Sequence, residues 1–180
     1  MRPTCDPQTP SLAIRQLAPN DEAAFLEGFN AWTGEDPAWH SFAWEKGMSH
    51  LEHLRILSDE HQGKNLLPGR VPHTMLYGFL DDIIVGRCSI RHKLNDYLRH
   101  IGGHLGYGVA PPFRRQGFAT QLFHAGRELL KNLGTTEALM SCATDNIASR
   151  KLIENAGGIL IDEVVDPSDQ RPTLRFRVPL

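Results

Sequence analysis

The chain has 180 residues, of which 41% are hydrophobic and 22% are charged, a balance typical of one globular domain of ordinary size. The formal net charge is −2 and the longest basic run is Arg114-Arg115, so we expect no nucleic-acid partner. No apolar stretch approaches the roughly 20 residues of a membrane-spanning helix, so we expect no membrane partner.

The cysteines are few and odd in number, which excludes a disulfide framework of paired residues. Cys88 and Cys142 lie in apolar runs and are expected to be small buried side chains, whereas Cys5 lies near the N-terminus. This usage suits a reducing compartment and predicts a cytoplasmic protein. The first ten residues contain three prolines and are expected to form a flexible lead before a single domain over residues 11–180.

The first half of the chain predicts one short strand, two helices and a hairpin. Leu12 and Ile14 indicate the strand, and Asn20 is expected to cap the first helix. The second helical region is expected from about Trp39 to Leu57, and the capping-box spacing of Ser49 and Glu52 lies inside it. Polar loops are expected over 61–72 and 92–101. Between them, a tight turn at Asp81-Asp82 joins strands expected over His73–Leu80 and Ile83–Arg91.

The second half alternates strands and helices. Apolar residues at every second position of 104–109 predict a strand, and apolar residues recurring every three or four positions predict a long helix over 117–133, with Gly134 as its cap. Further elements are a strand at 138–143, a helix ending at Gly157-Gly158, and strands at 159–165 and 174–178. This order mixes hairpins with right-handed crossovers and predicts an α+β fold, a central mixed sheet of about seven strands with helices on both faces.

A glycine-containing turn opens the long helix, in the segment Arg114-Arg-Gln-Gly-Phe-Ala-Thr120. The first backbone N–H groups of a helix have no partner inside it, and together with the helix dipole they form an anion site. Gly117 and Ala119 keep this turn low, and Arg114 and Arg115 add positive charge. The pattern favours a pyrophosphate site, and the alternative is an ordinary turn whose glycine aids packing. Neither a P-loop nor a correctly ordered G-x-G-x-x-G is present.

The segment Val109-x-Pro111-x-x-Arg114-x-x-Gly117-x-Ala119 resembles the coenzyme A motif of the GNAT acetyltransferase family, [QR]-x-x-G-x-[GA]. The later segment, which runs from Asn146 through Ser149 and Leu152-Ile153 to Gly157, resembles the second cofactor segment of that family. Residues 91–95 and 102–107 are similar to a poorly characterised subgroup of predicted acetyltransferases. The resemblance is close over about residues 71–165.

The resemblance implies a GNAT-like fold and acetyl-CoA as cosubstrate, with no metal. It also implies that the pantetheine arm lies like an extra strand along the segment ending at Val109. A bulge there, permitted by Gly106 and Gly108, would separate this strand from the next parallel one. Asn146 and Ser149 have helix capping as an alternative role. The implied cofactor residues are Gly108, Val109, Arg114, Arg115, Gln116, Gly117, Phe118, Ala119, Thr120, Asn146 and Ser149.

The implied reaction is direct transfer of the acetyl group to an amine in a ternary complex, with a backbone N–H near Val109 holding the developing oxyanion. His104 is the first candidate for the base that receives the amine proton, and its alternative role is that of a core histidine. Tyr107 is the second catalytic candidate, on the opposite face of the strand, with core packing as its alternative. The usual tyrosine that protonates the thiolate is replaced by Ile153, so solvent, Ser149 or another tyrosine would take that role.

The sequence leaves the acceptor open between a small-molecule amine and a protein amine. Arg91, His92 and Asp96 would shape an acceptor pocket or form a surface ion pair, and the early aromatic residues would form a pocket wall or pack in the core. His50-x-x-His53 lacks a convincing third metal ligand, so the two histidines are predicted to lie on a solvated face of the helix. A homodimer through the C-terminal strand and a coenzyme A-binding sensor with little turnover remain open. The aromatic residues are Trp32, Trp39, Phe42 and Trp44.

Overall fold

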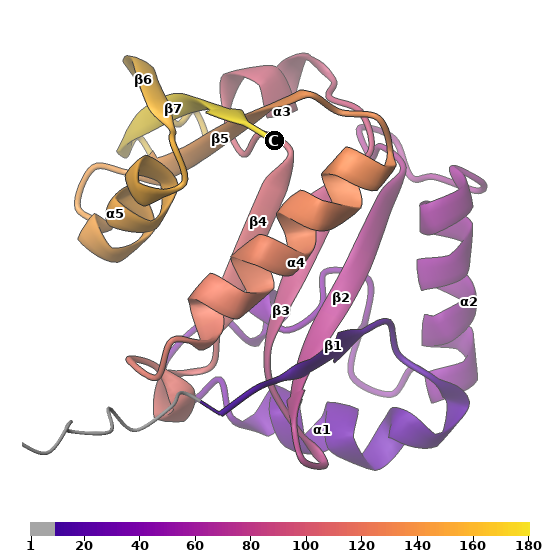
Figure 1. The fold of residues 1–180 in the computed structure, drawn as a ribbon. Helices are drawn as coiled ribbons and strands as arrows, with labels where there is room; N and C mark the ends of the chain where they lie inside the picture. Colours follow the sequence, from indigo (N-terminus) through magenta and orange to yellow (C-terminus); the bar gives the residue numbers. More distant parts are fainter. Residues whose placement is uncertain (1–9) are drawn as a thin grey trace, which may run out of the picture.

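The computed structural model describes residues 10–180, so residues 1–9, nearly all of the expected lead, and Cys5 lie outside the described part. Helices flank a layer of strands, with α4 on one face and α1 and α2 on the other (Figure 1). The strands are β1 (Ala13–Arg15), β2 (His73–Leu80), β3 (Ile83–Arg91), β4 (Leu105–Val109), β5 (Glu137–Ala143), β6 (Ile159–Val165) and β7 (Pro172–Pro179). The helices are α1 (Glu22–Asn30), α2 (His50–Gln62), α3 (Asp96–His100), α4 (Phe118–Asn132) and α5 (Ile147–Asn155).

The seven predicted strands are confirmed, but they form two hydrogen-bonded sheets rather than one. The first has the order β1-β2-β3-β4 and the second β5-β7-β6, and every pair within them is antiparallel. The sheets meet where the His104 N–H donates to the Leu139 carbonyl over 2.8 Å. Glycine is required beside this junction, because a Cβ at Gly103 would lie 2.2 Å from the Leu139 oxygen. Beyond it, β4 and β5 are not paired.

Helix α4 confirms the long helix predicted from apolar periodicity. Its buried stripe packs on the first sheet, and a Cβ at Gly126 would lie 2.3 Å from Leu105 and 2.8 Å from the Cys88 sulfur. Both ends are set by glycines with left-handed backbone, Gly117 with φ 78° and Gly134 with φ 82°. The predicted Gly134 cap is therefore confirmed. The stripe consists of Phe118, Leu122, Phe123 and Leu130.

The second predicted helix is wrong in its bounds, because α2 begins at His50 rather than near Trp39. Ser49 is its N-cap, and its hydroxyl accepts a hydrogen bond from the Glu52 N–H over 3.3 Å. The preceding residues are irregular, since buried His40 and Ser41 bind the core through side-chain hydrogen bonds. A capping residue inside the predicted span thus marks the true start of the helix.

Two further expectations are corrected. The connection expected over 92–101 contains α3, which is too short to show hydrophobic periodicity and is capped by the Asn95 side chain accepting from the Leu98 N–H over 2.9 Å. The face of α2 that carries His50 and His53 is buried rather than solvated, with Nε2 of His53 2.9 Å from the Ser41 hydroxyl. Within residues 10–180, no group of three or more potential ligands is placed to hold a metal ion.

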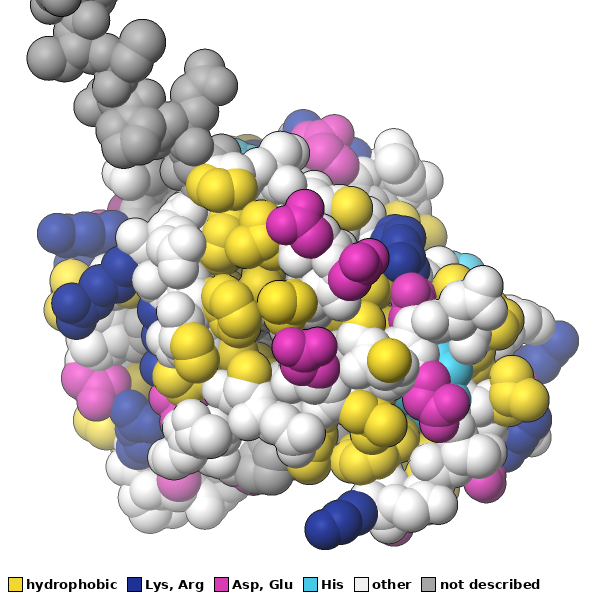
Figure 2. Space-filling view, turned by 90° about the horizontal axis from the view of Figure 1, so that it is seen from below, with side chains coloured by type: hydrophobic (Ala, Val, Ile, Leu, Met, Phe, Trp, Pro, Cys, Tyr) yellow, Lys and Arg dark blue, Asp and Glu magenta, His cyan; other side chains and the backbone are white. Residues whose placement is uncertain are grey.

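The face seen from below in Figure 1 shows hydrophobic side chains gathered among acidic ones, with basic side chains towards its edges (Figure 2). This face carries no broad basic surface. Cys88 and Cys142 are free and buried, which confirms their expected role as small core residues. Over residues 10–180, no helix has both the length and the apolar character that a membrane span requires.

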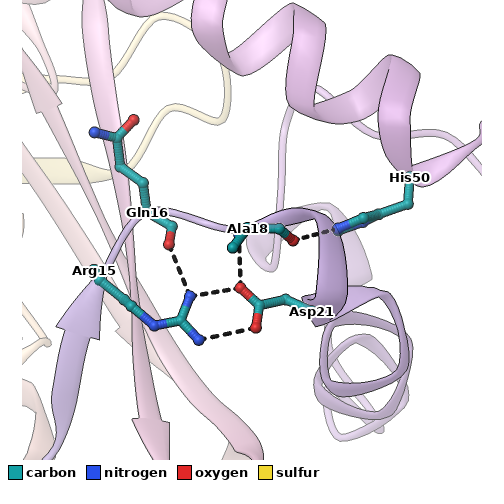
Figure 3. Close-up of polar contacts among 5 residues, drawn as sticks. All are labelled: Arg15, Gln16, Ala18, Asp21 and His50. Atoms are coloured by element: carbon teal, nitrogen blue, oxygen red, sulfur yellow. Dashed lines mark hydrogen bonds and ion pairs between the residues drawn. The ribbon is translucent and has the colours of Figure 1, made fainter.

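An ion pair fixes the chain between β1 and α1 (Figure 3). Arg15 donates through both terminal nitrogens to the two oxygens of Asp21, with Nη2 2.8 Å from Oδ1. The same carboxylate accepts from the Ala18 N–H over 2.7 Å, and the Ala18 carbonyl lies 2.9 Å from Nε2 of His50 on α2. Asp21 therefore joins β1, α1 and α2, and the Asn20 cap expected from the sequence is replaced by this network.

We expect Asp21→Ala to lower the free energy of unfolding by about 1–2 kcal/mol. This loss is smaller than that on breaking a fully buried charged network, because Arg15 is half-exposed. Hydrogen bonding from Arg15 lowers the pKa of Asp21 below its ordinary value of 3.8. A depressed folded-state pKa stabilises the fold above the ordinary value, and this stabilisation is lost as the pH falls through the folded pKa. Urea denaturation should show that the difference in free energy of unfolding between wild type and Asp21→Ala becomes smaller below about pH 4. The exposed-site control Asp82→Ala should be near neutral, and an equal loss there would contradict the network's role.

Candidate active site

Strand β4 is hydrogen-bonded to β3 along one edge, and along most of the other edge it pairs with no strand of residues 10–180. The Ala110 N–H donates to the Val85 carbonyl and the Arg91 N–H to the His104 carbonyl, each within 2.9 Å. In an antiparallel ladder these bonds alternate, so the main-chain groups of Tyr107 and Val109 point away from β3. The β4 edge that faces β5 therefore offers backbone donors and acceptors to an extended ligand.

The two faces of β4 differ in chemistry. Tyr107 packs against Phe123 of α4 with ring centroids 5.6 Å apart. On the other face, a Cβ at Gly108 would lie 3.0 Å from the Trp32 ring, and one at Gly106 would lie 3.3 Å from the Arg91 guanidinium. The bulge expected in β4 is not found, since its register with β3 is unbroken from 105 to 109. The glycines serve close approach of side chains from the opposite layer.

The loop before α4 presents a run of unused N–H groups. Arg115 has φ 61° and Gly117 has φ 78°, two left-handed residues that turn successive amides to one side. In the described part of the chain, no hydrogen bond is formed by the N–H groups of residues 115–119. The expected range included Thr120, but its N–H donates to the Gly117 carbonyl over 3.1 Å. The anion-binding set is therefore 115–119, and Gln116 contributes to it through its main chain.

Arg114 links two segments of the chain through hydrogen bonds and an ion pair, so its positive charge is already neutralised. Its Nη1 and Nη2 each lie 2.7 Å from an oxygen of Glu35, and its Nε donates to the Val109 carbonyl over 2.9 Å. The pair holds the loop after β4 against the chain that follows α1. Glu35 is not predictable as this partner from the sequence, because 79 positions separate the two residues.

The remaining cofactor candidates divide into anchors and rim residues. Phe118 is buried in the core, so only its main chain is available to a ligand, and Ala119 packs partly against the same core. Asn146 caps α5, its side-chain oxygen accepting from the Ser149 N–H over 3.1 Å, which is the alternative role considered for it. Ser149 lies near Tyr107, on the side of β4 that faces α4 and α5.

Tyr107 has a buried hydroxyl that forms no hydrogen bond with residues 10–180. Burial raises the pKa of Tyr107 to about 12, and the nearby Ser149 opposes part of that shift. A buried hydroxyl without a partner is unfavourable, so this group is available to a ligand atom. Ile153, at the position of the usual tyrosine, is a core residue with 1% exposure. Within residues 10–180, Tyr107 thus offers an unpaired hydroxyl close to α5, where the usual tyrosine is replaced by Ile153.

His104 is held by the second sheet. Its Nδ1 accepts a hydrogen bond from the Leu139 N–H over 3.0 Å, which places the ring proton of the neutral imidazole on Nε2. Burial lowers the pKa of His104. With one nitrogen accepting and the other carrying the proton, the ring has no free lone pair to receive a proton from an amine. The geometry favours a role in joining β4 to β5.

The early aromatic residues divide between the two roles considered for them. Trp44 packs in the core, its ring 4.8 Å from that of Phe29. Trp32 lies over β4, and the partly exposed rings of Trp39 and Phe42 lie against the buried guanidinium of Arg87. Arg87 was not among the predicted site residues, although a charged residue in the middle of the apolar run 83–90 was a signal for it.

Comparison with known families identifies the class of protein. Residues 11–159 match the acetyltransferase (GNAT) domain model. The chain therefore belongs to the GNAT acetyltransferase family, and its class of activity is acetyl transfer. This confirms the resemblance seen in the coenzyme A motif and its downstream segment. No curated protein sequence matches the chain.

Solved structures agree on the fold. The Salmonella typhimurium protein yncA, solved with its cofactor acetyl-CoA, is 14% identical with a TM-score of 0.63 and 94% coverage of both chains. A GNAT acetyltransferase from Streptococcus pneumoniae is 17% identical with a TM-score of 0.62, covering 94% of this chain and 99% of the other. A ribosomal-protein-alanine N-acetyltransferase from Brucella melitensis is 18% identical with a TM-score of 0.61, covering 93% and 99%. The predicted GNAT-like α+β fold is confirmed.

We expect the His104 ring to remain neutral, as the Nε2–H tautomer, at pH values where a free imidazole is half protonated, because protonating Nδ1 would break its bond from Leu139. Two-dimensional ¹H–¹⁵N spectra of the ring nitrogens across pH 5–8 report both tautomer and pKa. The same residue in the urea-unfolded chain is the control. A folded-state pKa at or above the unfolded one would contradict the assigned hydrogen bond.

Proposed function

We propose that the protein binds acetyl-CoA at residues 115–119 and along the open edge of β4, and transfers its acetyl group directly to an amine in a ternary complex. The observation that carries this proposal is the run of unpartnered N–H groups at the start of α4, beside an unpaired strand edge. A pyrophosphate supplies acceptors for such a run, and an amide-containing arm supplies partners for a strand edge.

The proposed cofactor residues act mainly through main chain. Amides of Arg115, Gln116, Gly117, Phe118 and Ala119 hold the pyrophosphate, and the outward main-chain groups of Tyr107 pair with the pantetheine arm. Gly108 gives close approach, Arg114 fixes the loop through Glu35, and Thr120 closes the first turn of α4. Asn146 and Ser149 set the start of α5 on the other side of this path. No role in this proposal requires a metal ion.

The reaction forms a bond between the amine nitrogen and the acetyl carbonyl carbon and breaks the bond from that carbon to sulfur. The nitrogen loses a proton to solvent water, the departing thiolate gains one from the protein, and the protein donor is reprotonated from solvent. Tyr107 supplies the proton to sulfur in this proposal, since its hydroxyl is buried, unpartnered and beside Ser149. His104 holds β4 against β5 at the closed end of the divergence. The amine arrives neutral, and the Val109 N–H stabilises charge on the carbonyl oxygen.

A coenzyme A-binding sensor is the second candidate, favoured by the core position of Ile153 and by the blocked lone pair of His104. A thiol-release assay with a panel of amines separates the two. Steady release with any amine supports the enzyme, whereas tight acetyl-CoA binding without release on every amine supports the sensor. A cytoplasmic setting fits the free buried thiols and remains, with the homodimer, a prediction.

We predict that Gly117→Glu abolishes the stabilisation of the fold by acetyl-CoA. The new side chain places a carboxylate where the pyrophosphate is proposed to bind. A ligand at a hundredfold excess over its dissociation constant stabilises by about 2.7 kcal/mol, which a melting assay resolves. Gly134→Glu is the matched control, because it carries the same left-handed backbone strain at the other end of α4, where a Cβ meets no atom within 4 Å. Equal acetyl-CoA stabilisation of the two variants would refute the pyrophosphate site.

We predict that Tyr107→Phe lowers kcat about 10- to 100-fold while leaving acetyl-CoA affinity nearly unchanged, because it removes only the proposed proton donor. Tyr77→Phe is the matched control, since Tyr77 also has a buried hydroxyl without a partner in the described chain, but packs with Phe25 on the other side of the first sheet. Stopped-flow measurement of thiol release checks both. A similar kcat for Tyr107→Phe and wild type would remove Tyr107 from the proposed mechanism.

A further inference from the structure

A pocket of about 540 Å³ opens on the side of the first sheet opposite α4. It is bounded by the loop before β2, by β2 and β3, and by α3, and this volume is suited to a small ligand. None of its lining residues is an aspartate or glutamate, so every polar residue of the lining is cationic or neutral. The polar lining residues are Arg70, His73, Ser89, Arg91, Asn95 and Tyr97.

Arg91 connects this pocket to β4. Its Nη1 donates to the carbonyls of Gly102 and Gly103 over 3.1 and 3.3 Å. Both terminal nitrogens lie 3.3 Å from the position of a Cβ on Gly106, so the guanidinium covers the centre of β4. Its Nε and Nη2 form no hydrogen bond with residues 10–180. A half-satisfied guanidinium thus lines a pocket beside the strand on which we propose that the acetyl group is held.

Arg87 lies four positions before Arg91 in β3, on the same face of the strand, with 0% exposure. It donates to the carbonyls of Trp39 and Gly106, while its buried Nη2 has no partner in the described chain. The rings of Phe42 and Trp39 lie 4.6 and 5.3 Å from its central carbon. Burial lowers the pKa of Arg87 to about 10, with the neighbouring Arg91 adding to the shift.

Among residues 10–180, no carboxylate forms an ion pair with these arginines, of which Arg87 is buried, Arg91 is half-buried and Arg70 is exposed. Across residues 10–180, none lies within ion-pair distance of Arg70, Arg87 or Arg91. The carboxylate that acts on Arg70 is Glu60, whose Oε2 lies 3.5 Å from Nε2 of His73, and burial raises the pKa of that carboxyl. Buried guanidinium groups are destabilising unless an anion or a set of acceptors satisfies them. The missing anion is therefore expected to come from a ligand.

We infer that the acceptor is a small amine that carries an oxyanion, such as an amino acid, and that Arg91 and Arg70 bind this oxyanion in the pocket beside Gly106. The inference rests on the proposed function, because it assigns the pocket to the acceptor of the acetyl group. A planar guanidinium with two free donors matches a carboxylate or phosphate group. Arg87 adds positive potential from below without reaching the pocket lining.

This arrangement also helps the amine to react. An ammonium group is stabilised by the carboxylate of its own molecule, and Arg91 and Arg70 neutralise that carboxylate when it binds. The positive potential of the three arginines then lowers the pKa of the neighbouring ammonium, because like charges disfavour the charged form. The neutral amine that attacks the thioester becomes more populated, although no histidine in the pocket is assigned as a base.

The test compares amino acids, each paired with the amine that lacks its carboxylate, and phosphoethanolamine paired with ethanolamine. Calorimetry on the protein–coenzyme A complex measures binding, and thiol release measures kcat/KM. We expect the preferred oxyanion-bearing member to exceed its partner about 10- to 100-fold in affinity and kcat/KM. The two kinds of pair distinguish carboxylate from phosphate. Equal values for all pairs, or a preference for an amidated peptide with N-terminal Asp over every free amino acid, would overturn the inference.

Two variants test the residues. Arg70→Gln changes an exposed residue at the rim and should raise KM for the oxyanion-bearing member several-fold more than KM for its amine partner. Arg91→Gln should remove most of the preference, with its melting temperature recorded to show that it folds. Arg55→Gln, on α2 and paired with Asp59, is the matched control and should keep the wild-type ratio. An unchanged ratio in Arg70→Gln and in folded Arg91→Gln would exclude these arginines from recognition.

The two proposals fail in different ways. If no amine is acetylated but amino acids bind in an arginine-dependent manner, the acetyltransferase proposal fails and the oxyanion pocket stands. If amines without an oxyanion are acetylated as well as those with one, acetyl transfer stands and the assignment of the acceptor fails. The binding and turnover measurements therefore give separate answers from the same samples.

Discussion

The site depends on the divergence of β4 from β5. The two strands are joined at the His104–Leu139 contact, and beyond it the backbone groups on the outer edge of β4 have no strand partner in the described part of the chain. An unpaired polar edge inside a protein is unfavourable unless a ligand or water satisfies it. The fold stabilises this arrangement with α4 packed across the first sheet, so the edge is held open by a rigid layer rather than by a loop.

The same divergence explains why so much of the chemistry is main-chain chemistry. At residues 115–119 and on β4, binding would use main-chain N–H and C=O groups, which almost every residue possesses. The side chains there matter because they set the backbone conformation and pack in the core. Gly117 supplies a left-handed turn, Phe118 anchors the loop in the core, and Arg114 is paired with Glu35. Of the two arginines in this motif, Arg115 has no ion-pair partner among residues 10–180, and the rest of the site is a set of main-chain amides.

Local patterns predicted most of the fold, because strand alternation, helix periodicity and glycine caps are local properties. The β2–β3 hairpin and α4 are found where the pattern placed them. The start of α2 was missed although Ser49 marked it, since aromatic residues before it extended an apparent helix. The candidate site was harder to predict, because Glu35 with Arg114 and Leu139 with His104 are pairs distant in the chain. Arg87 was recognisable only as a charge in a strand that is otherwise apolar.

The two-residue period of a strand gives β4 two separate tasks. Odd positions face α4, where Tyr107 places its hydroxyl on the side of the proposed cofactor path. Even positions are glycines, which allow Trp32 and Arg91 of the opposite layer to lie against the strand. A side chain at Gly106 would displace the guanidinium, and one at Gly108 would displace the indole ring. The absence of side chains on one face is therefore what lets the proposed acceptor pocket, with its positive charge, lie directly across β4 from the proposed cofactor path.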